Sequence, residues 1–197
     1  MRILLSPVLL AAFLGFAHGS RAEPPTPLPL PPAPAPIATT PVTGQDYRTK
    51  VVAPHAGRVL LVSLWATYCL PCIEELPGLM KLKKKLANKG ADVVFVNADG
   101  PGAPAGLLSG VLQRRSIVLE HTFVVDVEDP APFLAAVDPT WSGEVPFHAV
   151  YGRDGRRLAG LSGARPLAEI EQAVVAALAA APVPAPAPAA STAVTPP

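Results

Sequence analysis

Both cysteines of this 197-residue chain lie in the stretch Trp65-Ala66-Thr67-Tyr68-Cys69-Leu70-Pro71-Cys72. The stretch directly follows an apolar run, residues 59–64, which reads as a buried strand. It leads into residues 70–88, whose apolar residues have helical spacing. We therefore expect the cysteine pair where a strand ends and a helix begins.

That position has consequences for the chemistry of the pair. If Cys69 caps the helix, its sulfur faces unpaired backbone N–H groups and the positive end of the helix dipole. Both favour the thiolate, so the pKa of Cys69 is expected to fall below the free value of about 8.5. Cys72 lies one turn further on the same face, where it can form a disulfide with Cys69 or attack a mixed disulfide formed there. Pro71 falls in the first turn, where a missing N–H costs little.

Three other interpretations of the pair remain open. A structural disulfide is possible, but a bond across so short a loop restricts the unfolded chain little. Half of a zinc site would need a second pair of ligands, and the sequence has no second Cys pair. Two unrelated buried thiols would not need this spacing or this position between a strand and a helix. The pattern therefore favours a pair that takes part in thiol-disulfide exchange.

The stretch resembles the active-site motif of the thioredoxin superfamily. The longer run from Val59 through Ile73-Glu74-Glu75-Leu76-Pro77 is similar to the TlpA/ResA-like branch of exported thiol-disulfide oxidoreductases. The motif combines a Trp-Ala lead-in, C-x-P-C and a proline five residues after the second cysteine. The resemblance covers roughly residues 46–181. It implies that Cys69 attacks, that Cys72 resolves, and that Pro77 kinks the first helix.

The same resemblance assigns a role to Pro146. By its position before the expected hairpin it looks like the cis-proline of the family, which packs beside the active-site pair. The backbone of Val145 would then offer strand-like hydrogen bonds to a substrate chain. Trp65, Tyr68, Leu70 and Pro71 complete the expected substrate-binding surface, although Trp65 ends a buried strand and is also a core candidate.

The spacing of apolar residues predicts the order of the elements. Strands are expected at residues 58–64, 91–97 and 120–125, and helices at 70–88, 105–114 and 130–136. A hairpin, 147–151 and 157–161, and a last helix from Pro166 follow. This order predicts an α/β fold, a three-layer α/β/α sandwich with a mixed central sheet. It also resembles a thioredoxin fold.

The ends of the chain differ in composition from the middle. Residues 1–22 combine Arg2 with an apolar run and read as a signal peptide, with an uncleaved membrane tether as the second interpretation. Residues 23–45 are predicted to be a Pro-rich linker, and residues 182–197 a disordered Pro/Ala tail. The thioredoxin-like domain would be residues 46–181. We expect the protein in the periplasm or otherwise exported.

The chain departs from the family in three places. Thioredoxin has a buried Asp where this chain has Ser63, so a base for the resolving cysteine must come from elsewhere; Glu75 is a possible proton relay, or an exposed helix acid. His148 stands two residues after Pro146, where a small hydroxyl residue is common, and either ends a strand or tunes Cys69. Leu70 between the cysteines adds no charge.

The leading hypothesis is an exported enzyme that reduces protein disulfides. An upstream dithiol donor would then return its own cysteine pair to the reduced state. The resemblance suggests cytochrome c maturation, although the glutamate-bearing motif of dedicated members is not evident around Pro146. The alternative is a copper(I)-handling module that uses Cys69, Cys72 and His148; a third hypothesis is an adaptor that binds through its proline-rich tails. No cofactor is expected, and the net charge of +1 argues against a nucleic-acid partner.

Overall fold

A computed structural model describes residues 37–103 and 105–180. The predicted signal peptide, most of the predicted linker and the C-terminal tail lie outside these ranges. The domain is built on one sheet of six strands in the order β1-β4-β3-β2-β5-β6. These strands are β1 (Ala38–Val42), β2 (Val59–Trp65), β3 (Ala91–Asn97), β4 (His121–Val125), β5 (Phe147–Tyr151) and β6 (Arg157–Ser162). The first four run parallel to one another, whereas β5 and β6 are antiparallel to their neighbours, so the sheet is mixed as predicted.

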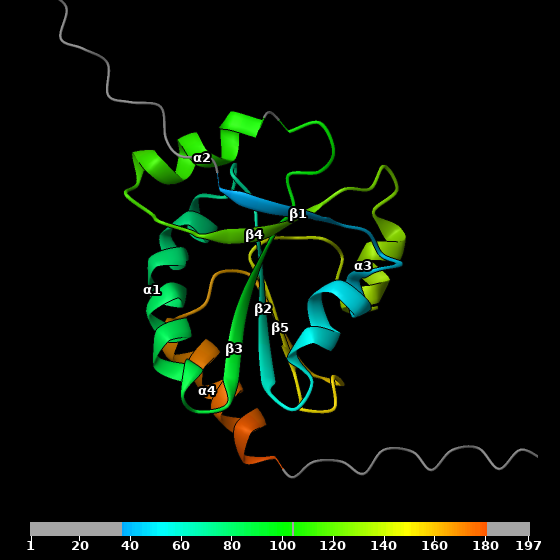
Figure 1. Cartoon of the computed structure of the whole chain (residues 1–197), viewed down its shortest axis with the longest axis vertical. Coiled ribbons are helices and arrows are strands. Elements are labelled where there is room, and N and C mark those ends of the chain that lie inside the picture. The colour runs from blue at the N-terminus through cyan, green and yellow to red at the C-terminus, as the bar shows by residue number, and fades with distance from the viewer. Residues whose placement is uncertain (1–36, 104, 181–197) are drawn as a thin grey trace, which may run out of the picture. The chain divides into compact units, whose positions relative to one another are not determined.

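Helices cover both faces of the sheet, which confirms the expected three layers (Figure 1). One face carries α1 (Leu70–Ala87), α2 (Ala105–Arg114) and α4 (Leu167–Ala179). The other carries α3 (Ala131–Val137) and two short helical turns, η1 (Arg48–Val52) and η2 (Ala53–His55). None of the helices among the described residues has the length and apolar character needed to cross a membrane.

Strand β2 shows why its sequence is apolar throughout. It is central, and its side chains alternate between the two faces of the sheet. Val59, Leu61 and Trp65 pack into the core under α1, and Leu60 and Val62 pack into the core under α3. Because both faces are covered by helices, no position on this strand favours a solvent-facing polar residue.

Helix α1 presents one apolar face to the sheet. Its buried side chains include Ile73, Leu76, Leu79, Leu82 and Leu86. Met80 is only half-buried, at the rim of that core. The lysines in the later turns of the helix are exposed and form a solvated face.

The domain begins earlier than the sequence predicts. Residues 38–42, placed in the linker by their composition, form β1 and pair in parallel with β4. The side chains of Thr40 and His121 add a hydrogen bond of 2.9 Å across this pair. Pro41 weakened the strand signal, yet a proline is tolerated at this position because β1 is an edge strand.

Candidate active site

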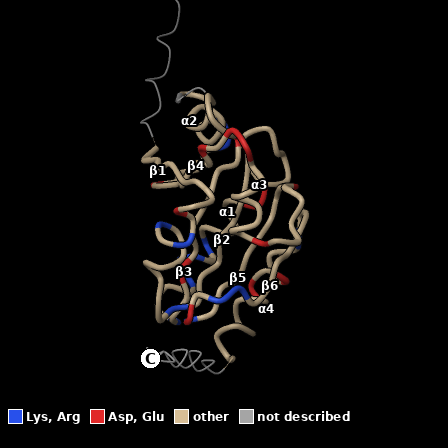
Figure 2. Tube along the Cα trace, turned by 90° about the vertical axis from the view of Figure 1, so that its right-hand side faces the viewer, with Lys and Arg blue, Asp and Glu red and all other residues tan. Residues whose placement is uncertain are grey.

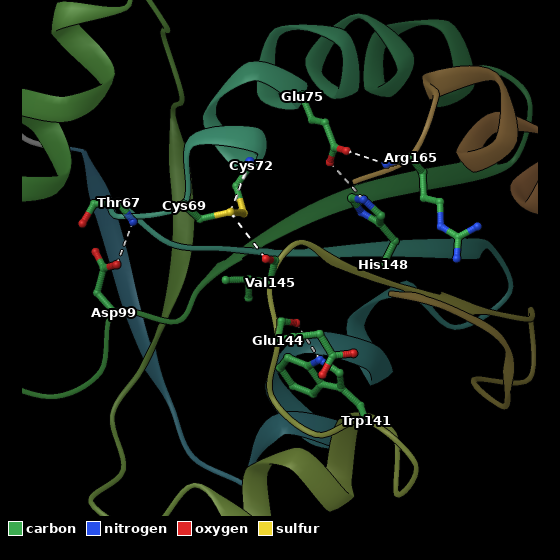
Figure 3. Close-up of a disulfide and its surroundings, with 10 residues drawn as sticks. All are labelled: Thr67, Cys69, Cys72, Glu75, Asp99, Trp141, Glu144, Val145, His148 and Arg165. Atoms are coloured by element: carbon green, nitrogen blue, oxygen red, sulfur yellow. Dashed lines mark hydrogen bonds and ion pairs between the residues drawn. A yellow bond between two sulfur atoms is a disulfide. The ribbon is translucent and has the colours of Figure 1, made fainter. Parts of the chain in front are cut away.

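The two cysteines lie at the N-terminus of α1 and form a disulfide bond (Figure 3). Cys69 is the N-cap residue, and its sulfur accepts a hydrogen bond of 3.2 Å from the backbone N–H of Cys72. The carbonyl of Cys69 accepts from Ile73 N–H at 3.1 Å, which starts the helix. The geometry expected from the sequence is therefore present. A backbone donor and the helix dipole both act on Cys69, which favours negative charge on this sulfur when the bond is open.

The two sulfurs differ in their access to solvent. Cys69 is 7% exposed and Cys72 only 1%. Tyr68 and Leu70 flank Cys69 and are 74% and 52% exposed. Cys69 is thus the sulfur that a partner can reach, and an apolar rim surrounds it.

Trp65 does not belong to this rim. Its side chain is 1% exposed and lies in the core under α1. Its indole Nε1–H donates to the Thr122 hydroxyl at 3.4 Å. The expectation that Trp65 lines the substrate surface is corrected accordingly. Trp65 packs in the core between the end of β2 and the helices on the α1 side of the sheet.

The loop before β5 closes over the disulfide. The Val145–Pro146 peptide bond is cis, in agreement with the role that the resemblance assigned to Pro146. The carbonyl oxygen of Val145 lies 3.6 Å from Cys69 Sγ. A disulfide sulfur carries no proton, so this approach is a contact rather than a hydrogen bond. It places backbone polar groups of the loop beside the exposed sulfur.

Aromatic packing fixes this loop from the opposite side of the sheet. Trp141 Nε1–H donates to the Glu144 carbonyl at 2.8 Å, and the indole stacks on Phe147 with ring centroids 4.8 Å apart. Hydrogen bonds from the hydroxyls of Ser142 and Ser162 hold the pKa of the Glu144 carboxyl below its usual value. The loop is therefore held by side chains that do not contact the cysteines.

Asp99 is a site residue that sequence reasoning missed. Its carboxylate accepts the backbone N–H of Thr67 at 2.7 Å and the side-chain amide of Asn97 at 3.1 Å. This anchors the turn between β2 and Cys69 to the end of β3. The available signal was its position, because the carboxyl ends of β2 and β3 meet at one edge of the sheet. A cavity of about 410 Å³ opens beside Asp99, but neither cysteine lines it.

Glu75 and His148 meet under α1. Glu75 follows Cys72 by one turn, and its Oε2 lies 3.2 Å from His148 Nε2. The other oxygen, Oε1, accepts the backbone N–H of Arg165 at 2.9 Å. His148 is completely buried, and the Glu75 side chain is only 13% exposed. Figure 3 shows Glu75 pointing from the helix toward the imidazole.

The hydrogen-bond partners indicate the tautomer of His148. Its Nδ1 is buried and has no hydrogen-bond partner among the described residues. A second N–H there would be left unsatisfied, at a cost of about 1–3 kcal/mol or more. A bare acceptor nitrogen at Nδ1 is the less costly arrangement. The proton of His148 is therefore assigned to Nε2, which donates to the Glu75 carboxylate at 3.2 Å.

The copper alternative finds no support in this arrangement. Within residues 37–103 and 105–180, no three His, Cys, Asp or Glu side chains are grouped closely enough to hold a metal ion. His148 faces Glu75 instead of completing a site with the two sulfurs. The nitrogen that it leaves free is buried and offers no open coordination position.

Charged residues are unevenly placed around the domain. Lys and Arg gather mainly in the half of the domain where α1 ends and β3 begins, away from the N-terminus of α1 (Figure 2).

Comparison with known proteins gives a consistent result. The family model described as Redoxin matches residues 32–128. Thioredoxin-like protein YneN of Bacillus subtilis is 49% identical over 41 residues, which are 21% of this chain and 24% of YneN. Thiol-disulfide oxidoreductase ResA of Halalkalibacterium halodurans is 36% identical over 45 residues, 23% of this chain and 26% of ResA. The matched stretches thus span only about a quarter of these curated relatives.

A solved structure matches over a longer stretch. A proposed thiol:disulfide interchange protein DsbE from Chlorobium tepidum is 29% identical and superposes with a TM-score of 0.52. The match covers 64% of this chain and 84% of the other. The likeness to that protein therefore extends well beyond the cysteine motif.

Proposed function

Because the chain is a TlpA/ResA-like member of the thioredoxin superfamily, we propose that it is a thiol-disulfide oxidoreductase that reduces disulfide bonds in other proteins. The observation that carries the proposal is the Cys69–Cys72 disulfide at the N-terminus of α1, with the Cys72 N–H donated to Cys69 Sγ at 3.2 Å. This hydrogen bond acts on the more exposed of the two sulfurs, which is the one that must attack.

The reaction is a two-electron exchange. The Cys69 thiolate attacks one sulfur of a substrate disulfide, which forms a mixed disulfide and releases the first substrate thiolate. Cys72 then loses its proton and attacks the Cys69 sulfur, which releases the second substrate thiolate. The substrate gains two electrons and takes up two protons, and the enzyme ends in the oxidised state. An external dithiol donor returns it to the reduced state.

The substrate is held by an apolar rim and one backbone segment. Tyr68, Leu70 and Pro71 are exposed around Cys69, and the Val145 carbonyl lies beside its sulfur. An extended substrate segment would pair with the Val145 backbone and place an apolar side chain on Tyr68 or Leu70. We assign Glu75 as the group that accepts the Cys72 proton, because it lies one turn further along α1 and is largely shielded from water.

We further propose that the protein works outside the cytoplasm. The apolar sequence of residues 1–22 supports export, and the resemblance of the cysteine motif to the TlpA/ResA-like branch implies a role in cytochrome c maturation or related thiol chemistry. Sequencing the N-terminus of the protein from its native host should find a start near Ser20 or Glu23, or an intact N-terminus in the membrane fraction. A soluble cytoplasmic form that retains Met1 would contradict export.

Single-cysteine variants test the exchange reaction. Cys72→Ser should attack substrates and accumulate mixed disulfides, since nothing resolves them, whereas Cys69→Ser should trap nothing. Non-reducing electrophoresis followed by mass spectrometry measures both. Trapping by Cys69→Ser alone would reverse the two roles. If neither variant traps a partner and both lose only stability, the pair is a structural disulfide and the proposal is wrong.

The redox potential tests the direction of the reaction. Titration of the Cys69/Cys72 pair against glutathione should give a value near the roughly −270 mV of thioredoxin rather than the roughly −120 mV of DsbA. A strongly oxidising value would make the protein a donor of disulfides instead of a reductase.

A further inference from the structure

His148 is a completely buried polar residue that the exchange reaction does not otherwise use. Strand β5 pairs His148 with Ser63 of β2 and with Leu161 of β6. Its side chain lies on the α1 side of the sheet, where it meets Glu75. Strand β5 and the loop before it thus each supply one group of the site. The loop brings the Val145 carbonyl to Cys69, and the strand brings the His148 imidazole to Glu75.

Ser63, Arg165 and Glu169 are the polar residues to consider around the His148–Glu75 pair. Ser63, at the position where thioredoxin has its buried acid, is buried and has no ionisable group. Two charged residues around the start of α4 are linked to Glu75 by hydrogen bonds, Arg165 directly and Glu169 through Arg165. The Arg165 side chain donates to the Ser162 carbonyl and to Glu169, so only its backbone N–H acts on Glu75.

We propose that His148 is a positioning residue for the resolving step: its Nε2–H holds the Glu75 carboxylate aimed into the domain, so that Glu75 can take the proton of Cys72. This inference rests on the proposed exchange reaction and on the assignment of Glu75. The imidazole Nε2–H donates one hydrogen bond to Glu75 Oε2, and Arg165 N–H donates one to Oε1. Both oxygens of a largely buried carboxylate are then satisfied without a buried counter-charge.

In this arrangement the resolving step proceeds as a proton transfer followed by a disulfide exchange. The Cys72 thiol gives its proton to the Glu75 carboxylate, and the Cys72 thiolate attacks Cys69 in the mixed disulfide. The Cys69–substrate bond breaks, and the substrate sulfur leaves as a thiolate. Glu75 then returns the proton to water or to the departing thiolate. His148 keeps its proton on Nε2 throughout and continues to donate to Glu75.

The experiment isolates the resolving step. The reduced full-length protein is mixed with 5,5′-dithiobis(2-nitrobenzoate). Cys69 attacks and releases one thionitrobenzoate, and Cys72 releases the second, so stopped-flow absorbance separates the two steps. We expect Glu75→Gln to slow the second release by about 100-fold or more at neutral pH. We expect His148→Leu to slow it by roughly 10- to 100-fold, because the carboxylate loses its aim.

The pH profile separates positioning from general damage. At high pH the Cys72 thiol ionises without help, so the rates of His148→Leu and Glu75→Gln should converge on the wild-type rate. His148→Gln, which keeps a donor near the Nε2 position, should recover much of the neutral-pH rate. His148→Asn, whose shorter amide does not reach Glu75, should behave like His148→Leu and serves if the leucine variant does not fold.

Tyr151→Phe is the matched control. Tyr151 lies on the same strand but faces the α3 side, where its hydroxyl bonds with Tyr47 and the Val137 carbonyl. Its loss should lower stability without changing the shape of the pH profile. If Glu75→Gln slows the second release and neither His148→Leu nor His148→Asn does, the role of His148 is wrong while the exchange reaction stands. If His148→Leu slows the second release by the same factor at every pH, the effect is structural damage. That result also overturns the positioning role of His148.

Failure of the proposed reaction would look different. If the first release of thionitrobenzoate is absent in the wild type, the exchange function itself is wrong. If Glu75→Gln leaves the second release unchanged, the assignment of Glu75 is wrong and the inference about His148 falls with it. A double variant Glu75→Gln/His148→Leu that is no slower than Glu75→Gln alone supports the inference, because the two residues then act through one proton transfer.

Discussion

Asp99 offers a test of how the turn before Cys69 is held. Asp99→Ala removes the 2.7 Å hydrogen bond to Thr67 N–H and the 3.1 Å bond from Asn97. Hydrogen bonds to a charged group contribute about 1.5–3 kcal/mol, and partial exposure of the carboxylate places this case near the lower end. We expect the free energy of unfolding to fall by about 2 kcal/mol, which for a domain of this size lowers Tm by about 6 °C.

The assay is thermal and chemical denaturation of the oxidised protein. Asp99→Asn is the control, because it keeps an acceptor for Thr67 N–H while it removes the charge, and it should lose about half as much. In the reduced protein, alkylation of Cys69 should also slow in Asp99→Ala, since a looser turn weakens the cap on α1. A Tm within about 2 °C of wild type would show that the turn is held by α1 itself and that Asp99 adds little.

Two further predictions concern charge and docking. Partial burial alone would raise the pKa of Asp92, but hydrogen bonds from Arg58 and His55 and their charges outweigh it and hold that pKa below its usual value. Such a group stabilises the fold above its unfolded pKa of about 3.9, and this contribution is lost as the pH falls through the folded value. Asp92→Asn should therefore be about 1 kcal/mol less stable at pH 7, with a deficit that shrinks from pH 5 toward pH 2 in urea titrations; a constant deficit would contradict it. Tyr68→Ser should slow the reduction of insulin about 2- to 10-fold and leave the reaction with a small aromatic disulfide unchanged, and equal losses on both would argue against a docking role.

Local sequence patterns were sufficient for most of the framework. The apolar runs of β2 and β3 and the helical spacing in α1 predicted these elements to within a residue or two, because burial on both faces leaves little freedom in composition. The active cysteine and the cis-proline were available from the motif and its resemblance. Strand β1 was missed because Pro41 and its neighbours resemble the preceding linker, and only pairing with β4 makes the segment a strand.

Contacts between distant segments could not be predicted in the same way. The meeting of Glu75 with His148 depends on the register between β2 and β5 and on the crossing of α1 over the sheet. The bond from Thr67 to Asp99 depends on two strands ending at the same edge. The burial of Trp65 depends on Thr122, which is contributed by β4. Each of these is a property of topology, and no window of neighbouring residues contains it.

The edge position of β1 bears on whether copies of this protein can associate by pairing their strands. An open strand edge recruits edges of other chains, and that is how many sheets polymerise. Here Pro41 has no N–H to offer, and its carbonyl oxygen already accepts from Lys50 Nζ at 3.3 Å. A chain that approached this edge would therefore find no N–H donor at Pro41, the fourth of the five residues of β1. Growth of a shared sheet along β1 is disfavoured at this residue, so Pro41 protects the edge from self-association.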